Sequence, residues 1–302
     1  EIHWRDWSSD VCSSDLSSGV VHIAPVSAPG SIVYWTTSGG SALKGFRVGD
    51  TQAMTVITPT AMRASAPGDD TQCIGCHTSS PDGLLAFMGR SPMSNNYPFM
   101  IDGRMVDGTS RRPSATVVSD NAVTQLRRYL QFMPTFSPAH YTPTDSVVIT
   151  VGGPWTPFGP FELVWTDLHA TSGGTGFITR QGDPNWADSP SFSKDGTLIA
   201  YSSTDDIAID QWPSINDIYT VPYASGAGGT ARPLPGAAEP NWNEYYPAYS
   251  PSDTFIAFNR VPVNTQVYDS PNAEVYVVPG RGGQATRLRA NDPPACVGKP
   301  SP

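Results

Sequence analysis

The stretch PSFSKDGTLIAY (190–201) decides the fold, because related stretches recur along the chain. The related stretches are HTSSPDGLLAF (77–87), PTFSPAHYTPTDSVVIT (134–150) and PAYSPSDTFIAF (247–258). One serine aligns in all four stretches at spacings of 57, 56 and 57 residues: Ser80, Ser137, Ser193 and Ser250. A constant period of this length is typical of a repeat architecture.

Each repeat predicts a short strand, a tight turn and a second strand. The turns contain Pro-Asp-Gly, Lys-Asp-Gly or Pro-Ser-Asp, which are residues that favour tight turns. A further strand, a Gly-rich turn and another strand are also expected in each unit. The expected further strands are IVYWTT (32–37), FELVWTDL (161–168), DIYTVPY (217–223) and EVYVVPG (274–280). The unit is therefore predicted to be four antiparallel strands without a helix.

Four-stranded units that repeat at this spacing indicate an all-β fold, a β-propeller. A serial β-sandwich is the alternative, and the constant period disfavours it. We expect about four to five blades in this chain, as part of a propeller of six or seven blades. The propeller domain is predicted to span residues 17–302.

The repeat also resembles a known family. The pattern Pro-x-Phe/Tyr-Ser-Pro/Lys-Asp-Gly, followed by Ile-Ala-Phe/Tyr and later by Asp-Ile-Tyr-x-Val, is similar to that of TolB-type, WD-repeat-like propellers. The resemblance covers about residues 20–290. It implies the propeller fold, and it leaves the function open because propellers serve as binders, scaffolds and enzymes.

Composition narrows the function classes. The net charge of −9 argues against nucleic-acid binding, which requires a basic face. The sequence contains no run of 18 apolar residues, so no membrane span is predicted.

The first 16 residues are interpreted separately, because RDWSSDVCSSDL (5–16) resembles a translated sequencing adapter. Residues 1–16 are therefore expected to be a non-native segment outside the propeller domain.

One motif predicts specific chemistry. Cys73-Ile74-Gly75-Cys76-His77 has the C-x-x-C-H pattern of covalent haem attachment. In that chemistry two thiols add to the vinyl groups of the porphyrin, and the adjacent histidine binds the iron. About 0.001 such motifs are expected by chance in a chain of this composition. A redox-active cysteine pair, a zinc site and a plain disulfide remain as alternatives.

The repeat alignment places this motif in the propeller. His77 aligns with a proline of the other repeats, and Cys76 aligns with Met133, Ser189 and Tyr246. The motif is therefore predicted to straddle the loop that leads into the innermost strand of a blade. A haem there would cap one mouth of the central channel.

The sixth iron ligand is predicted less directly. Met93 is the first candidate and Met133 the alternative, and an open sixth position is also possible. His140 and His169 are expected in turns on the opposite face. Trp186 and Trp242 recur before two innermost strands, where they would wall the channel or pack between blades.

These observations predict an extracytoplasmic monohaem c-type cytochrome that carries haem c on a propeller and transfers electrons to a redox partner protein. Covalent haem is attached outside the cytoplasm, so a bacterial periplasmic or extracellular location is expected. Two alternatives stay open. One is a TolB-like propeller that binds proteins or ligands without haem, and the other is a haem enzyme with an open iron site.

Overall fold

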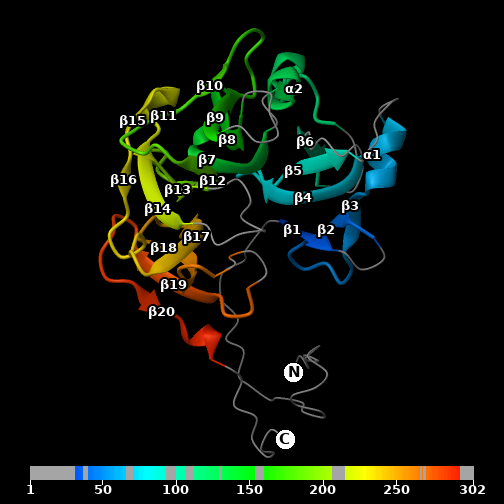
Figure 1. Cartoon of the computed structure of the whole chain (residues 1–302). Helices are drawn as coiled ribbons and strands as arrows, with labels where there is room; N and C mark the ends of the chain where they lie inside the picture. Colours follow the sequence, from blue (N-terminus) through cyan, green and yellow to red (C-terminus); the bar gives the residue numbers. More distant parts are fainter. Residues whose placement is uncertain are drawn as a thin grey trace, which may run out of the picture.

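The computed structural model describes residues 31–36, 40–65, 71–92, 100–106, 112–128, 131–153, 160–205, 215–265, 267 and 270–292. The described sheets follow one another along an arc, in the order of the sequence (Figure 1). The adapter-like segment 1–16 and Met93 lie outside the described residues.

Five sheets of three or four antiparallel strands build this arc. The first two have three strands each: β1 (Ser31–Thr36), β2 (Ala42–Arg47) and β3 (Met54–Ile57), then β4 (Thr71–Ser79), β5 (Leu85–Pro92) and β6 (Met100–Met105). The third has four strands: β7 (Phe132–Thr142), β8 (Asp145–Gly152), β9 (Glu162–Asp167) and β10 (Thr175–Phe177). The fourth and fifth also have four: β12 (Trp186–Phe192), β13 (Leu198–Thr204), β14 (Asn216–Pro222) and β16 (Arg232–Pro233), then β17 (Trp242–Tyr249), β18 (Phe255–Pro262), β19 (Glu274–Pro279) and β20 (Thr286–Arg287).

The strands that begin the four repeats, β4, β7, β12 and β17, each lie first in their sheet, and consecutive ones contact each other. The strand order and these contacts place them innermost, with the later strands of each sheet farther from the axis. This radial arrangement of sheets is a β-propeller, as the repeat predicts.

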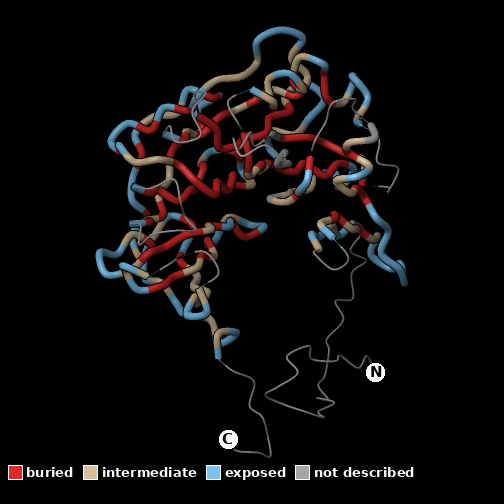
Figure 2. The backbone as a smooth tube through the Cα atoms, turned by 45° about the vertical axis from the view of Figure 1, so that its right-hand side comes forward, coloured by how far each residue is buried: buried red, intermediate tan, exposed pale blue. Residues whose placement is uncertain are grey.

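The hydrophobic core is divided among the spaces between neighbouring sheets. Alternate residues of β13 illustrate the reason, since successive side chains of a strand point to opposite faces. Ile199 and Tyr201 pack against the third sheet, whereas Ala200 packs against the fifth. Both faces of the strand are therefore buried, and Figure 2 shows the buried residues concentrated in the interior of the molecule with exposed residues around its edge.

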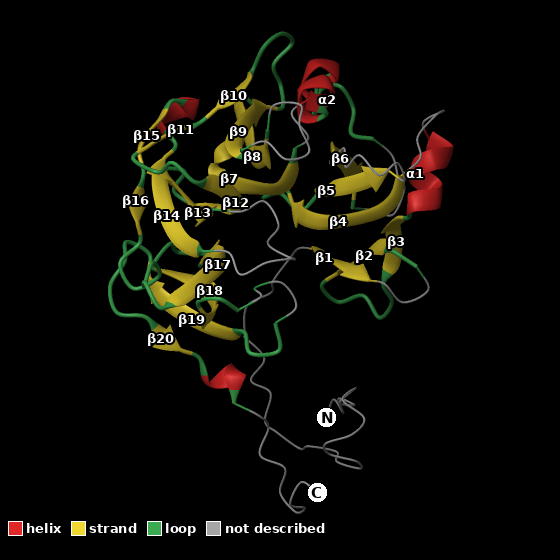
Figure 3. Cartoon of the chain, viewed as in Figure 1, coloured by secondary structure: helices red, strands yellow, loops and turns green. Residues whose placement is uncertain are grey.

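Two short helices correct the expectation of units without helices. They are α1 (Pro59–Ser65), after the third strand of the first sheet, and α2 (Asp120–Leu126), after that of the second (Figure 3). Buried α2 side chains, Ala122 and Leu126, pack between the second and third sheets. Within the described part of the chain, neither α-helix approaches the ~20 residues that crossing a bilayer requires.

The connection between the third and fourth sheets also differs from the expected arrangement of antiparallel strands. The segment predicted as one strand after the Gly-rich turn splits into β10 and β11 (Thr179–Gln181). Strand β11 pairs in parallel with β15 (Gly228–Thr230), which belongs to the next repeat. Two single-turn 3-10 helices complete the described elements: η2 (Ala224–Gly226) and η3 (Arg289–Asn291).

Candidate functional site: the innermost strands

Each innermost strand contains a β-bulge at the same position of the repeat. The pairing register shifts between Gly75 and Thr78 in β4, and the other three strands shift at the aligned positions. Those shifts lie between Phe132 and Thr135, between Asp188 and Ser191, and between Tyr245 and Ala248. A bulge re-aims the side chains of the residues that it inserts. The repeat alignment made from the sequence therefore corresponds to a repeated backbone feature.

Three aligned bulge residues, Met133, Ser189 and Tyr246, have φ of 51°, 47° and 54°. Such positive values are costly for residues with a side chain, and they persist where the surrounding structure imposes them. Their recurrence at one height of the propeller makes the bulges a candidate site for function. Cys76 is the aligned residue of β4.

Hydrogen bonds between neighbouring blades hold the innermost strands side by side. The Phe192 N–H donates to Thr135 Oγ1 at 3.2 Å, and the Tyr249 N–H donates to Ser191 Oγ at 3.0 Å. These two bonds join aligned positions of successive repeats. A hydroxyl residue follows the aligned proline or histidine in three of the four repeats, and this is the sequence signal for such bonds.

The turns after three innermost strands share one hydrogen bond, made to the hydroxyl of the aligned serine. The aligned serine hydroxyl accepts a hydrogen bond from the first residue of the next strand: Leu85 N at 3.0 Å from Ser80, Leu198 N at 3.0 Å from Ser193, and Phe255 N at 3.3 Å from Ser250. The buried serines thus close the hairpins. The turns after β12 and β17 are also joined, since Asp253 accepts from the backbone N–H groups of Lys194 and Asp195.

A cavity of about 300 Å³ lies where these turns converge, and we call it the channel-end hollow. Four sheets contribute to its lining: Thr78, Ser79, Pro81, Thr135, Phe136, Pro138, Lys194 and Pro251. Among these described lining residues, Lys194 alone carries a charge. The hollow therefore offers hydroxyl groups, an aromatic face and one cation to a ligand.

The position of the Cys73–His77 motif corrects the sequence-based expectation. The whole motif lies inside β4 rather than in the loop that leads into it. The bulge gives the reason, because it lets an extended strand accommodate Cys76 and His77 opposite Met88 without ending the pairing with β5. The next two residues, Thr78 and Ser79, line the channel-end hollow. The side chains of Cys73 and Cys76 lie outside the described part.

The His77 ring is the one described side chain among the proposed attachment residues. Its Nε2 lies 3.1 Å from the carbonyl oxygen of Val33 in β1, and the ring is half-buried. This nitrogen would have to release the carbonyl before it could bind iron. Among the described side chains, no three histidine, cysteine, aspartate or glutamate groups converge. The binding of haem at this motif stays a prediction.

Met133, the alternative sixth ligand, lies in the β7 bulge. Its sulfur lies 3.5 Å from Ser189 Oγ, and its side chain packs against the core between the third and fourth sheets. Met133 therefore faces the next blade along the arc. Its role as an iron ligand stays a prediction, as does that of Met93.

His140 does not lie in a solvated turn, contrary to expectation. Strand β7 is longer than predicted, and the ring stacks on Phe192 at a centroid distance of 5.6 Å. Its Nδ1 lies 2.7 Å from Asp145 Oδ2.

Trp186 packs edge-on against Phe161 of the preceding sheet, and Trp242 lies under the Arg260 guanidinium of its own sheet.

Asp188 is a buried acid in the β12 bulge. Burial raises the pKa of this carboxyl to about 6, although hydrogen bonds from Ser189 oppose the shift. Burial likewise raises the pKa of Glu244, on β17, to about 7, against the influence of Arg260. Acids with raised pKa values are frequent at functional sites, but structural networks produce them too.

Sequence reasoning missed a buried ionic network between the third and fourth sheets. Arg180 donates to Asp183 at 2.6 Å and to Glu162 at 2.7 Å. Asp183 also accepts from the hydroxyls of Tyr201 and Ser203 at 2.7 and 2.8 Å. The sequence signal for this network is the repeated Asp/Glu-Pro-Asn-Trp sequence at the start of β12 and β17, of which only the tryptophans were predicted to have a role.

Comparison with solved structures agrees with this architecture. TolB from Acinetobacter baumannii matches with a TM-score of 0.54 and 17% identity, over 86% of this chain and 52% of that protein. A protein assigned as TolB from Agrobacterium tumefaciens matches with a TM-score of 0.53 and 17% identity, over 86% and 79% of the two chains. A prolyl endopeptidase matches with a TM-score of 0.50 and 12% identity, over 86% and 34%.

The fold is that of TolB-type propellers. The chain spans about half the length of the Acinetobacter protein, and identities this low show the fold alone. No protein-family model matches the sequence, and no curated protein matches it.

Proposed function

We propose that the chain is a binding propeller that takes a protein or ligand at the channel-end hollow. The observation that supports this proposal is the convergence of four sheets on one cavity of about 300 Å³, within the range of ligand sites. The hollow is lined by threonine and serine hydroxyls, an aromatic ring and the half-buried Lys194. The TolB-type fold is compatible with such a role, and an extracytoplasmic location belongs to the same proposal.

Photocrosslinking from the hollow tests this proposal. A photoreactive side chain at the exposed Pro251 is expected to give a discrete adduct, because it lies on the rim of the hollow. Reversal of the one lining charge, by Lys194→Glu, is expected to weaken an interaction made there.

A second candidate function is electron transfer by haem c, attached through Cys73 and Cys76 with His77 as an iron ligand. The observation that favours it is the C-x-x-C-H pattern at the β4 bulge. The aligned bulges of the other three innermost strands contain no cysteine. The motif also adjoins the hollow, so a haem attached there would lie in the same region as the proposed binding site. The contact between His77 Nε2 and the Val33 carbonyl opposes a preformed iron site, so coordination of iron by this nitrogen would require the ring to turn.

Production together with a cytochrome c maturation system tests the haem candidate. The unaltered chain is expected to give a pyridine-haemochrome spectrum and the mass of one bound haem. The Cys73→Ser/Cys76→Ser variant should give neither, while Cys12 and Cys296 remain as matched cysteines. A colourless unaltered chain with its mass unchanged would exclude covalent haem and leave the binding propeller.

A further inference from the structure

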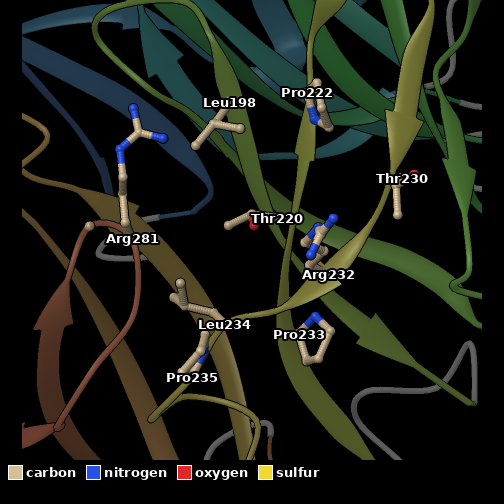
Figure 4. Close-up of a pocket in the computed structure, with 10 residues that line it drawn as sticks. Leu198, Thr220, Pro222, Thr230, Arg232, Pro233, Leu234, Pro235 and Arg281 are labelled. Atoms are coloured by element: carbon tan, nitrogen blue, oxygen red, sulfur yellow. The ribbon is translucent and has the colours of Figure 1, made fainter.

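A second cavity lies at the outer side of the propeller, between the fourth and fifth sheets. Its volume is about 520 Å³, and we call it the interblade groove. Its walls include Leu198, Thr220, Arg232, Leu234, Gly280 and Arg281. Figure 4 shows Arg232 on β16 and Arg281 on the loop after β19, on opposite sides of Thr220. The groove is separate from the channel-end hollow and shares no lining residue with it.

The two arginines of the groove differ from the ion-paired arginines of the chain in their surroundings. Elsewhere in the described part, the arginines of four ion-pair groups face carboxylates within 4 Å: Arg104, Arg180, Arg260 and Arg287. Neither Arg232 nor Arg281 has such a partner among the described residues. Arg281 lowers the pKa of Asp195, behind the larger effects of hydrogen bonds from Thr197 and Ser193, but forms no contact ion pair with it. Two exposed guanidinium groups thus share one groove in a chain of net charge −9.

The remaining lining combines two threonines with apolar residues, several of which supply no free backbone donor. Pro222, Pro233 and Pro235 contribute no N–H group, and the N–H of Leu234 is already bonded to Ile218. These four positions therefore offer no free backbone N–H to an added strand, the mode by which extended peptides join a sheet edge. Recognition must come from the guanidinium groups and from contact with Leu198 and Leu234.

We propose that the interblade groove binds a small organic anion. A carboxylate or phosphate group would lie between Arg232 and Arg281, because planar guanidinium groups bind such oxyanions through paired hydrogen bonds. An apolar part of the ligand would cover Leu198 and Leu234. The cavity volume lies in the range of small-molecule sites.

Calorimetric titration of the full chain at low ionic strength tests the proposal. The probes are phenylacetate, phenyl phosphate and the neutral phenylacetamide. At least one anion is expected to bind saturably and the amide not to bind, and the preferred anion distinguishes carboxylate from phosphate. Arg232→Gln and Arg281→Gln should each weaken binding about tenfold, as loss of one charged hydrogen-bonding group predicts.

The matched control is Arg47→Gln, an exposed arginine of β2 at the other end of the arc, which should bind like the unaltered chain. Circular dichroism verifies that each variant is folded. The proposal is overturned if neither anion saturates, if the amide binds as tightly as the anions, or if a variant that combines Arg232→Gln with Arg281→Gln keeps the affinity of the unaltered chain.

Discussion

Asp183→Ala is expected to destabilise the propeller by about 3 kcal/mol, because it removes one of the two carboxylates that pair with the buried Arg180 and leaves two hydroxyls without their acceptor. The Asp183 side chain is fully buried, and that of Arg180 is 3% exposed. Tyr201 and Ser203 donate to the same carboxylate. Burial, and next the Asp183 charge, raise the pKa of Tyr201, so this hydroxyl remains a donor throughout the working range.

Thermal and urea unfolding measure this effect. A midpoint lowered by roughly 10 °C is expected for Asp183→Ala in a domain of this size. The matched control is Asp292→Ala, whose ion pair with Arg287 is exposed and should contribute about 1 kcal/mol or less. Equal losses in the two variants would show that the Arg180 network does not join the third and fourth sheets as described.

Gly236→Ala is expected to cost about 3 kcal/mol, for two reasons that act together. Gly236 has a φ of +85°, which residues with a side chain rarely adopt. An added Cβ would also overlap the backbone carbonyl oxygen of Gly283. That backbone cannot move freely, because the Gly283 N–H donates to the Pro235 carbonyl at 2.8 Å. The loop joining the fourth and fifth sheets would have to shift.

Gly173→Ala separates the two causes. Gly173 also has a positive φ, of +60°, but an added Cβ there meets no atom within 4 Å. It should therefore cost only about 1 kcal/mol, the contribution of backbone strain. Urea unfolding of the two variants gives the comparison, and an equally small loss for Gly236→Ala would contradict the close packing of this loop against Gly283.

The repeat made the fold predictable, because each blade carries its own local signals. The Ser193 repeat has a hydroxyl that closes the hairpin, an Asp-Gly turn and a strand that is apolar on both faces, and all three act within a dozen residues. The Ser137 repeat lacks the Asp-Gly turn, and β7 continues to Thr142 instead. The misplaced His140 follows from that extension.

The two helices were not predicted, although the sequence contains an N-cap residue for each of them. The Ala122 N–H donates to the Ser119 hydroxyl at 3.0 Å, and the Ala61 N–H donates to the Thr58 hydroxyl at 3.1 Å. Strand periodicity elsewhere in the chain concealed these two short signals. The parallel pairing of β11 with β15 had no local signal, since it joins residues about 50 positions apart.

The candidate site could be predicted only in part. Spacing aligned Cys76 with Met133, and the repeated bulge explains why that alignment holds. The channel-end hollow and the interblade groove depend on contacts between different blades, which no single repeat encodes. Lys194 illustrates this, because it stands in a turn of one repeat and lines a cavity shared by four sheets.

The binding role of the channel-end hollow is tested most directly by crosslinking in the cells that produce the protein. One photoreactive probe replaces Pro251 on the rim, and a control probe replaces Thr171, which is exposed in the turn between the outer strands β9 and β10. A discrete adduct from Pro251 alone, reduced by Lys194→Glu, is the expected result. The same adducts from both positions, or none from Pro251, would contradict binding at the hollow.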